Sequence, residues 1–287
     1  MPLFCRHNRL TANCPICSRE LEAELRAKAP PRTRTPSTRS ASGAGPRRPR
    51  GGGRTTGVVT RRLQRAADDG YRNPLVPGLR ATADAERLAA ALLAAARRLE
   101  PPGPAPEVAA EPDLEEATWL AFLHAIGAEE RLSWGSGEAP ASHARTAEAY
   151  RAWSRRAGAQ AAGIAGEPAW TPQRRFSRAF ERLTISGFTR APRFEYLVTL
   201  GAAGRYDIEA GELHLAAGED ATTDAAKRLL VSGDKLLLER RARELAEACA
   251  VPVAALDRGL AVWGTPGEPV DLADEIPAPV AAALGLR

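Results

Sequence analysis

Lysine is almost missing from this chain of 287 residues, where only Lys28, Lys227 and Lys235 contribute to the 40 basic residues. Arginine and alanine are abundant instead, a bias that a GC-rich coding sequence produces, so arginine richness alone is weak evidence for nucleic-acid binding. Long apolar runs are also missing, because none reaches the roughly 18 residues that a membrane span requires. A hydrophobic signal segment is absent as well. We therefore expect a soluble cytoplasmic protein without membrane contact, and association with the nucleoid is compatible with this expectation.

Acidic residues are absent between positions 25 and 67, where twelve arginine and lysine residues occur. The formal net charge of the whole chain is +5, so the residues outside this stretch carry −7. Residues 30–56 are rich in Pro, Gly, Ser, Thr and Arg and have almost nothing apolar to bury, which predicts a disordered linker. Its segment 45–51 loosely resembles a minor-groove hook, but the pattern favours a solvated basic linker attracted to any polyanion.

Cysteine is scarce, and three of the four cysteines lie within the first 17 residues. Cys5, His7, Cys14 and Cys17 have the spacing C-x-H, six residues, then C-x-x-C, and they supply the four ligands of a closed tetrahedral zinc site. Disulfides are disfavoured in a reducing compartment. A redox C-x-x-C motif usually opens a helix after a strand, and no strand is predicted before it. The pattern predicts one structural Zn²⁺ ion in a small module at residues 1–29.

Strand patterns are nearly absent, whereas apolar residues recur at helical spacing from about residue 58 onward. The spacing and the capping residues predict helices over residues 82–99, 114–129, 143–162, 172–183, 190–200, 220–230, 234–249 and 252–263. A Pro-rich stretch over 101–112 is predicted as a second linker. The chain is therefore predicted to be all-α, with the zinc module at 1–29, the basic linker at 30–56 and a helical domain at 57–287.

The segment 172–200 predicts a helical hairpin whose turn contains Gly187. Six arginines and one glutamate lie between Arg174 and Arg193. A helix N-terminus after a tight turn presents free N–H groups to a phosphate. The candidate nucleic-acid contacts of this hairpin are Arg174, Arg175, Arg178, Gly187, Thr189, Arg190 and Arg193. An ordinary corner between two helices with a solvated arginine face accounts for the same pattern.

The turn residues Leu183 to Ala191 resemble the Leu-x-x-Pro-Gly-Val-Gly-x-Lys hairpin of helix-hairpin-helix DNA glycosylases, and the likeness covers about residues 112–265. The resemblance implies a DNA-repair enzyme with a catalytic aspartate at Asp224, or else at Asp220, that stabilises an oxocarbenium-like sugar. Ala191 stands where bifunctional members carry a lysine, which implies base excision without a covalent intermediate. Four rings are available to stack on an extruded base, although each is more often a core residue: Trp119, Trp153, Trp170 and Tyr196.

Two other functional classes explain the same residues. A nucleic-acid-binding protein without catalysis accounts for the zinc module, the basic linker and the hairpin. A helical adaptor for other proteins accounts for the net acidic helical domain. The sequence decides neither the presence of catalysis nor the oligomeric state.

Overall fold

The computed structural model describes residues 66–216, 220–265 and 275–286, which all belong to one compact unit beginning at Val59. Within these ranges the chain forms helices and no strands, so the predicted all-α class is confirmed for the described part. The predicted zinc ligands Cys5, His7, Cys14 and Cys17 and the predicted linker at 30–56 lie outside the described residues. The zinc site therefore stays a prediction.

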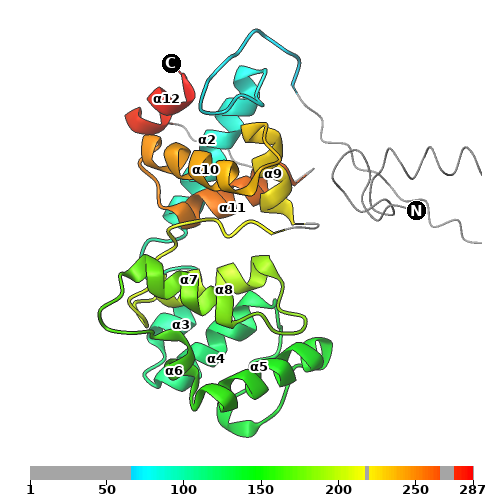
Figure 1. The fold of residues 1–287 in the computed structure, drawn as a ribbon, viewed down its shortest axis with the longest axis vertical. Coiled ribbons are helices and arrows are strands. Elements are labelled where there is room, and N and C mark those ends of the chain that lie inside the picture. Colours follow the sequence, from blue (N-terminus) through cyan, green and yellow to red (C-terminus); the bar gives the residue numbers. More distant parts are fainter. Residues whose placement is uncertain (1–65, 217–219, 266–274, 287) are drawn as a thin grey trace, which may run out of the picture. The chain divides into compact units, whose positions relative to one another are not determined.

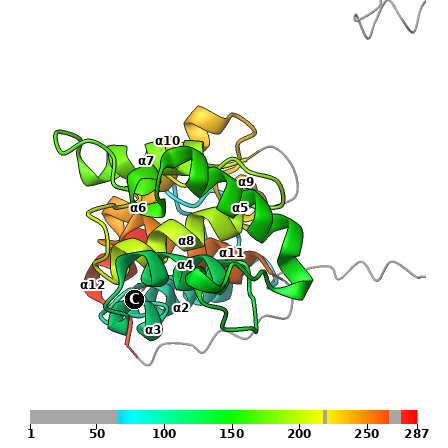
Figure 2. The same ribbon diagram turned by 90° about the horizontal axis from the view of Figure 1, so that it is seen from below.

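The helices fall into two groups, each with its own hydrophobic core (Figures 1 and 2). The first core is aliphatic and takes most of its buried side chains from Leu, Ala and Val residues. It contains the first described helix and the last four, so the chain leaves this group and later returns to it. Its helices are α2 (Thr82–Arg97), α9 (Ala221–Leu230), α10 (Lys235–Ala248), α11 (Val253–Gly264) and α12 (Ala278–Leu284).

The second core is aromatic. Trp119, Phe122, Tyr150 and Tyr196 are fully buried and stack or meet edge to face, with ring centroids 4.1 to 6.4 Å apart. Trp153 is also buried, so three of the four rings considered for base stacking lie in this core. The helices of this group are α3 (Pro106–Ala110), α4 (Leu114–Ala125), α5 (Ala144–Ala157), α6 (Gln160–Ile164), α7 (Pro172–Arg182) and α8 (Arg190–Ala202), with short 3₁₀ turns at Trp134–Ser136 and Ala141–His143.

Local signals explain where most helices begin and end. The side chain of Thr171 accepts a hydrogen bond from the backbone N–H of Arg174, and Pro172 occupies the first turn of α7. Gly158 adopts a φ of +91° and ends α5, which splits the predicted helix 143–162 into α5 and α6. Two elements were not predicted: α3 lies in the stretch expected to be a linker, and α12 had no assignment.

The α7–α8 hairpin and the segment that follows it connect the two groups. Residues 183–189 form the turn, and Gly187 has a φ of +79°. After α8, the chain runs through residues 203–216 back toward the first group (Figure 1). Along this return segment, Ile208 belongs to the aromatic core, whereas Leu213 and Leu215 belong to the aliphatic core. The return segment therefore packs into the cores of both helical groups.

Candidate functional site at the junction of the two helical groups

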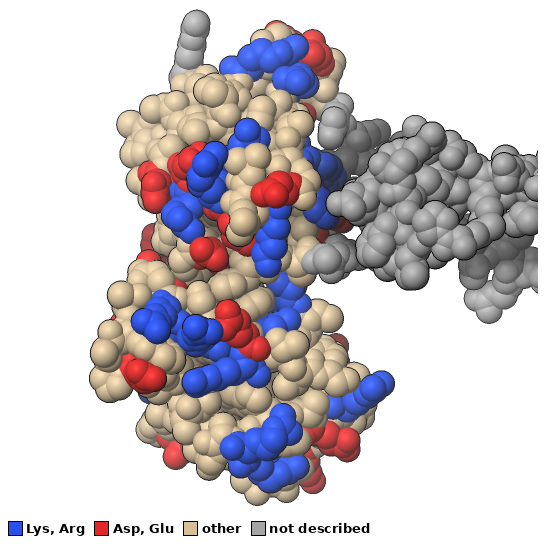
Figure 3. All heavy atoms as spheres, viewed as in Figure 1, with Lys and Arg blue, Asp and Glu red and all other residues tan. Residues whose placement is uncertain are grey.

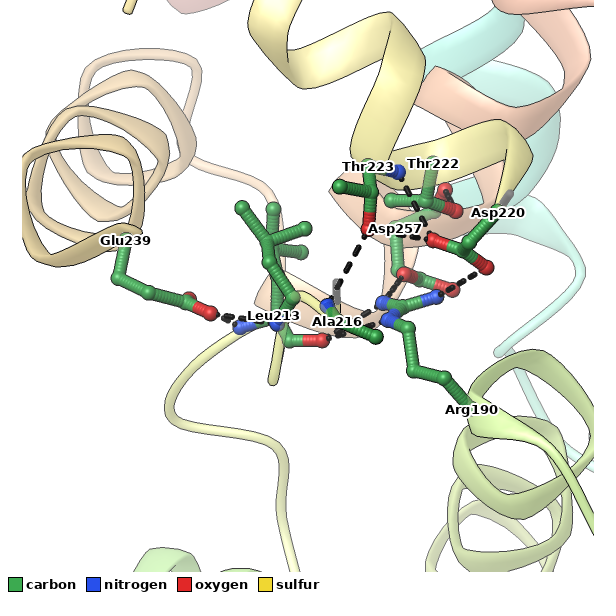
Figure 4. Close-up of polar contacts among 9 residues, drawn as sticks. Arg190, Leu213, Ala216, Asp220, Thr222, Thr223, Glu239 and Asp257 are labelled. Carbon is green, nitrogen blue, oxygen red and sulfur yellow. Dashed lines mark hydrogen bonds and ion pairs between the residues drawn. The ribbon is translucent and has the colours of Figure 1, made fainter. Parts of the chain in front are cut away.

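Arg190, the first residue of α8, reaches from the aromatic group into a polar cluster of the other group (Figure 4). Its side chain is only 3% exposed. Its Nε and Nη2 atoms donate to the Leu213 carbonyl at 3.1 and 2.6 Å, and Nη2 also pairs with Asp257 Oδ1. Nη1 lies 3.4 Å from Asp220 Oδ1. One guanidinium thus holds the return segment, the start of α9 and α11 together.

The two carboxylates of this cluster differ in their surroundings. Asp220 precedes α9 and caps it, because Oδ2 accepts from the backbone N–H and the hydroxyl of Thr223 at 2.8 and 2.7 Å. Asp257 lies within α11, where burial raises its pKa and the charge of Arg190 opposes the rise only in part. The guanidinium of Arg190 stays charged, as arginine does in proteins. Asp220 and Asp257 are therefore committed to a buried ionic network.

Glu239 fixes the return segment from the other side. Its two carboxylate oxygens accept from the backbone N–H groups of Leu213 and Leu215 at 2.8 and 2.7 Å (Figure 4). His214 lies between these two residues with a φ of +53°. Its ring stacks on Phe180 at 4.4 Å, and its Nε2 atom lies 3.3 Å from Ser177 Oγ. The two hydrogen bonds to Glu239 fix the backbone on both sides of His214, and its imidazole faces α7.

Burial makes His214 sensitive to pH. Burial first, and then the positive charges of Arg190 and Lys235, lower its pKa from 6.5 to about 4. Between these values the unfolded chain binds a proton that the folded protein does not, so the free energy of unfolding falls as the pH falls. Compared with His214→Asn, the natural protein should lose about 2 to 3 kcal/mol more between pH 7.5 and 4.5 in urea titrations. Asn tolerates positive φ and does not titrate.

Ser177→Ala is the matched control, because it removes the neighbour of the imidazole and keeps the titrating group. This variant should retain the full pH dependence. Equal pH dependence of the natural protein and His214→Asn would show that the ring is not held in its neutral form.

A cavity of about 730 Å³ opens beside the cluster, between α7, the return segment and α10. Its lining is strongly charged, with three arginines and four glutamates. The charged residues are Arg174, Arg178, Glu181, Glu209, Glu212, Arg243 and Glu247. Two ion pairs lie in this lining. Arg178 pairs with Glu181 within α7 at 2.8 Å, and Arg243 of α10 pairs with Glu212 of the return segment at 3.0 Å. A second cavity of about 510 Å³ shares Glu209, Ala210 and Pro252 with the first and has a more apolar lining.

The predicted site residues do not come together as one centre. Asp224 is not part of the cluster. Its side chain is 56% exposed, and its Oδ1 atom lies 4.0 Å from Lys227 Nζ. Asp220 is in the cluster, where it caps α9 and faces Arg190. Gly187 and Thr189 are exposed in the α7–α8 turn. The two predicted aspartates thus have different environments, although Asp220 is the cap of α9 and Asp224 lies in its first turn.

The predicted arginines also divide into two kinds. Arg174 and Arg178 are exposed on α7 and line the charged cavity. Arg175 instead binds Asp207 and the carbonyls of Glu167 and Pro168. Arg193 donates to the Phe180 carbonyl at 3.1 Å and to Thr184 Oγ1 at 2.7 Å. Arg190 is buried, so its guanidinium makes internal contacts, although a phosphate contact was predicted for it.

The sequence interpretation gave no role to Asp257 and Glu239, the two other carboxylates of the cluster. A signal for Asp257 was present, because it is the one acidic residue of α11, whose other members apart from Arg258 are apolar or glycine. A carboxylate on such a helix needs a partner when it is buried. Glu239 gave no such signal, since α10 contains two other glutamates, Glu244 and Glu247, in a similarly charged sequence.

One family model matches the chain, that of alpha-glutamyl/putrescinyl thymine pyrophosphorylase clade 3, over residues 136–265. The match covers a little under half of the chain and includes every residue of the Arg190 cluster and of the charged cavity. There is no significant match among curated proteins or solved structures. Within the described residues, no helix has the length and apolar character to cross a membrane, and no group of three or more His, Cys, Asp or Glu residues is arranged to hold a metal ion.

The family match corrects the interpretation as a helix-hairpin-helix DNA glycosylase, and with it the assignment to base-excision repair. The matched region overlaps the segment on which that resemblance rested. A hairpin with a glycine in its turn occurs in many helical proteins, because the turn needs a positive φ whatever the function. The turn also has Ser186 and Thr189 where the glycosylase motif has Pro and Gly.

Proposed function

We propose that this protein is an enzyme of DNA base modification that joins an amine to the methyl carbon of thymine with release of pyrophosphate. The observation that carries the proposal is the family match over residues 136–265. The family description names three chemical parts: a thymine, a glutamyl or putrescinyl substituent, and pyrophosphate. All three are accounted for by one substitution at the carbon attached to the pyrimidine ring.

The reaction balances without a redox step. The amine nitrogen attacks a methylene carbon that carries a pyrophosphate ester, a C–N bond forms and the C–O bond breaks. Pyrophosphate leaves with the bonding electron pair, and the amine loses one proton to a base. An enzyme for this reaction needs cations for the leaving group, carboxylates for the amine and its proton, and a site for the thymine.

The charged cavity offers these groups in one place. Arg174, Arg178 and Arg243 present guanidinium groups, which bind phosphate oxygens in a bidentate way. Glu209 on the return segment and Glu247 on α10 are exposed carboxylates of the same cavity and suit an ammonium group or a transferred proton. The volume of about 730 Å³ lies within the range of small-molecule sites. We assign Asp220, Asp257 and Glu239 to positioning, because they hold the return segment that forms one wall.

The face that carries this cavity also supports a DNA substrate. Arg and Lys side chains gather over α7 and over α5 in Figure 3, with carboxylates among them. The exposed arginines of α7 are Arg174, Arg178 and Arg182. Guanidinium groups on a helix of an exposed hairpin suit the phosphates that flank a target base. We therefore place the α7–α8 hairpin against the DNA backbone, with the target thymine entering the charged cavity.

The decisive experiment is a pyrophosphate-release assay. A synthetic duplex in which one thymine carries a pyrophosphate ester on its methyl group is incubated with the protein and either glutamate or putrescine. Pyrophosphate should be released, and mass spectrometry of the digested DNA should find the corresponding amine adduct. Arg243→Gln should lower the rate about 10-fold to 100-fold, as expected for loss of a charge-assisted hydrogen bond.

Arg97→Gln is the matched control, since Arg97 is exposed in the last turn of α2 and belongs neither to the cavity lining nor to the α7–α8 hairpin. This variant should keep its rate within about 3-fold, the size expected of an exposed charge. Absence of adduct and of pyrophosphate with both amines would refute the proposed reaction.

A further inference from the structure

The second cavity, of about 510 Å³, is formed by close contacts between the return segment and both helices of the hairpin. At the start of α7, the Pro172 carbonyl accepts a hydrogen bond from the Glu209 N–H at 3.3 Å. Near the end of α8, a Cβ on Gly201 would stand 2.5 Å from the Ile208 carbonyl oxygen, so this close approach requires glycine. The apolar wall of the cavity includes Leu99, Phe176, Val198 and Ala254.

The charged groups of this cavity are all of one sign. Within the described residues, its lining contains two carboxylates and no arginine, lysine or histidine. The carboxylates are those of Asp207 and Glu209, which are exposed, whereas the neighbouring Tyr206, Ile208 and Ala210 are buried. The return segment therefore presents both carboxylates on its exposed side, next to an apolar wall.

One of the two negative charges is not offset by an ion pair. Glu209 Oε2 accepts from Gln173 Nε2 at 2.8 Å, and this neutral partner leaves the carboxylate charged. Asp207 Oδ2 pairs with Arg175, which lies outside the lining, and Oδ1 has no partner in the part of the chain that the structure describes. Two carboxylates and one guanidinium give this region a net charge of −1.

The neighbouring charged cavity has little positive charge to spare for a second anion. Its three arginines and four glutamates give a net charge of −1, and Arg178 and Arg243 already pair with Glu181 and Glu212. A pyrophosphate ester adds further negative charge. A glutamate molecule is itself a net anion and would be repelled, whereas the two ammonium groups of an aliphatic diamine balance the charge.

We propose that the second cavity binds the amine donor and selects an aliphatic diamine over glutamate. The methylene chain lies against the apolar wall, and one amino group lies at Glu209, which lines both cavities and so directs the nitrogen toward the charged cavity. The other amino group lies at Oδ1 of Asp207. Glutamate is disfavoured because its carboxylates would meet an apolar wall and no cation of the lining. The inference rests on the proposed function for the electrophile and deepens it by naming the donor.

The test measures binding of putrescine and of glutamate to the natural protein by isothermal titration calorimetry, without DNA. Putrescine should bind at least about 10-fold more tightly than glutamate. Glu209→Gln removes the charge and keeps the shape, so the affinity for putrescine should fall about 10-fold, as expected for loss of a charge-assisted hydrogen bond. Glu148→Gln is the matched control, because Glu148 is exposed on α5 and belongs to neither lining, and its affinity should stay within about 2-fold.

A second variant tests where the methylene chain lies. Ala254 lines the second cavity and not the first, so Ala254→Leu fills part of the space and should weaken putrescine binding about 10-fold. Ala254 is half-buried near the start of α11, where leucine suits the helix, and urea titration should show a folded protein. Ala261→Leu is the control on the same helix, since Ala261 is also half-buried but lines neither cavity, and it should bind putrescine normally.

The outcomes distinguish this inference from the proposed reaction. Pyrophosphate release with glutamate and not with putrescine would overturn the diamine site and leave the reaction standing. Putrescine binding that both Glu209→Gln and Ala254→Leu weaken, without any pyrophosphate release, would support the site and refute the reaction. Equal putrescine affinity in the natural protein and in either of these variants would overturn the site.

Discussion

Replacement of Arg190 with methionine should lower the free energy of unfolding by about 3 to 5 kcal/mol, the range expected when one partner of a buried ion pair is removed. The methionine side chain fills similar space but leaves Asp220, Asp257 and the Leu213 carbonyl without their donor. Each is shielded from water, so the loss includes the cost of burying uncompensated charge. Urea titration of the purified variant at pH 7.5 measures the effect.

The pH dependence of this loss identifies its origin. Burial raises the pKa of Asp257 and Arg190 opposes that rise, so without the guanidinium Asp257 binds a proton at higher pH in the folded variant. The loss should therefore shrink as the pH falls from 7.5 to 5. The combination Arg190→Met, Asp220→Asn and Asp257→Asn should recover part of the stability at pH 7.5, because no uncompensated charge remains.

Arg178→Met is the matched control for Arg190. Arg178 belongs to the same hairpin, but its side chain is 52% exposed and its partner Glu181 is 60% exposed. An exposed pair of this kind contributes about 0 to 1 kcal/mol. If Arg190→Met and Arg178→Met lose the same stability, the cluster does not hold the two helical groups together.

Replacement of Gly187 with alanine should lower the free energy of unfolding by about 2 to 5 kcal/mol, from two additive causes. The φ of +79° is unfavourable for any residue with a Cβ, at a cost of roughly 1 to 2 kcal/mol. A Cβ at this position would also overlap the hydroxyl of Thr146 in α5. Relief of such an overlap requires movement of the hairpin or of α5, at about 1 to 3 kcal/mol. Urea titration again measures the sum.

Two further variants separate these causes. Gly204→Ala places a Cβ at a φ of +66° in open space, so it should show the backbone cost alone. Thr146→Ala removes the hydroxyl, and in the Gly187→Ala background it should recover the steric part of the loss in a double-mutant cycle. No recovery in that background would mean that the turn and α5 are not packed as described.

The Arg190 and Gly187 variants and the functional assays probe different parts of one arrangement. Gly187 lies in the turn before α8, and Arg190 is the first residue of α8. The turn packs on α5, and Arg190 fixes the return segment whose residues 209–212 line the charged cavity. A loss of stability at either position is therefore expected to disturb the cavity as well.

Local chemistry was enough to predict most helices, because caps and breaks act within a few residues. A helix was predicted over 172–183, and α7 occupies 172–182 with Thr171 as its cap. Another was predicted over 234–249, and α10 occupies 235–248 with Asp234 as its cap. Where a local signal was misjudged, the boundary was wrong: Gly158 ends α5, although the helix was predicted to continue to residue 162. The short helix α3 was hidden by a run of prolines.

The function was interpreted wrongly because the residues used for it do not specify a function by themselves. A glycine turn between two arginine-rich helices serves any hairpin, and the same glycine is required here by the closeness of Thr146. The assignment of Asp224 rested on spacing from that hairpin, and the structure leaves its carboxylate exposed. Similarity of the whole region 136–265 carries more information than nine residues of one turn.

By itself the sequence determined the helical class and the approximate bounds of its main helices, because these depend on contacts within one or two turns of the chain. Only the tertiary structure decided what Arg190 does. Its partners Leu213, Asp220 and Asp257 are 23, 30 and 67 residues away along the chain. No local pattern connects these positions, and an arginine in a basic hairpin looks accessible until the return segment and α11 bury it. Burial, which converts an expected phosphate contact into an internal ion pair, is a property of the packed chain.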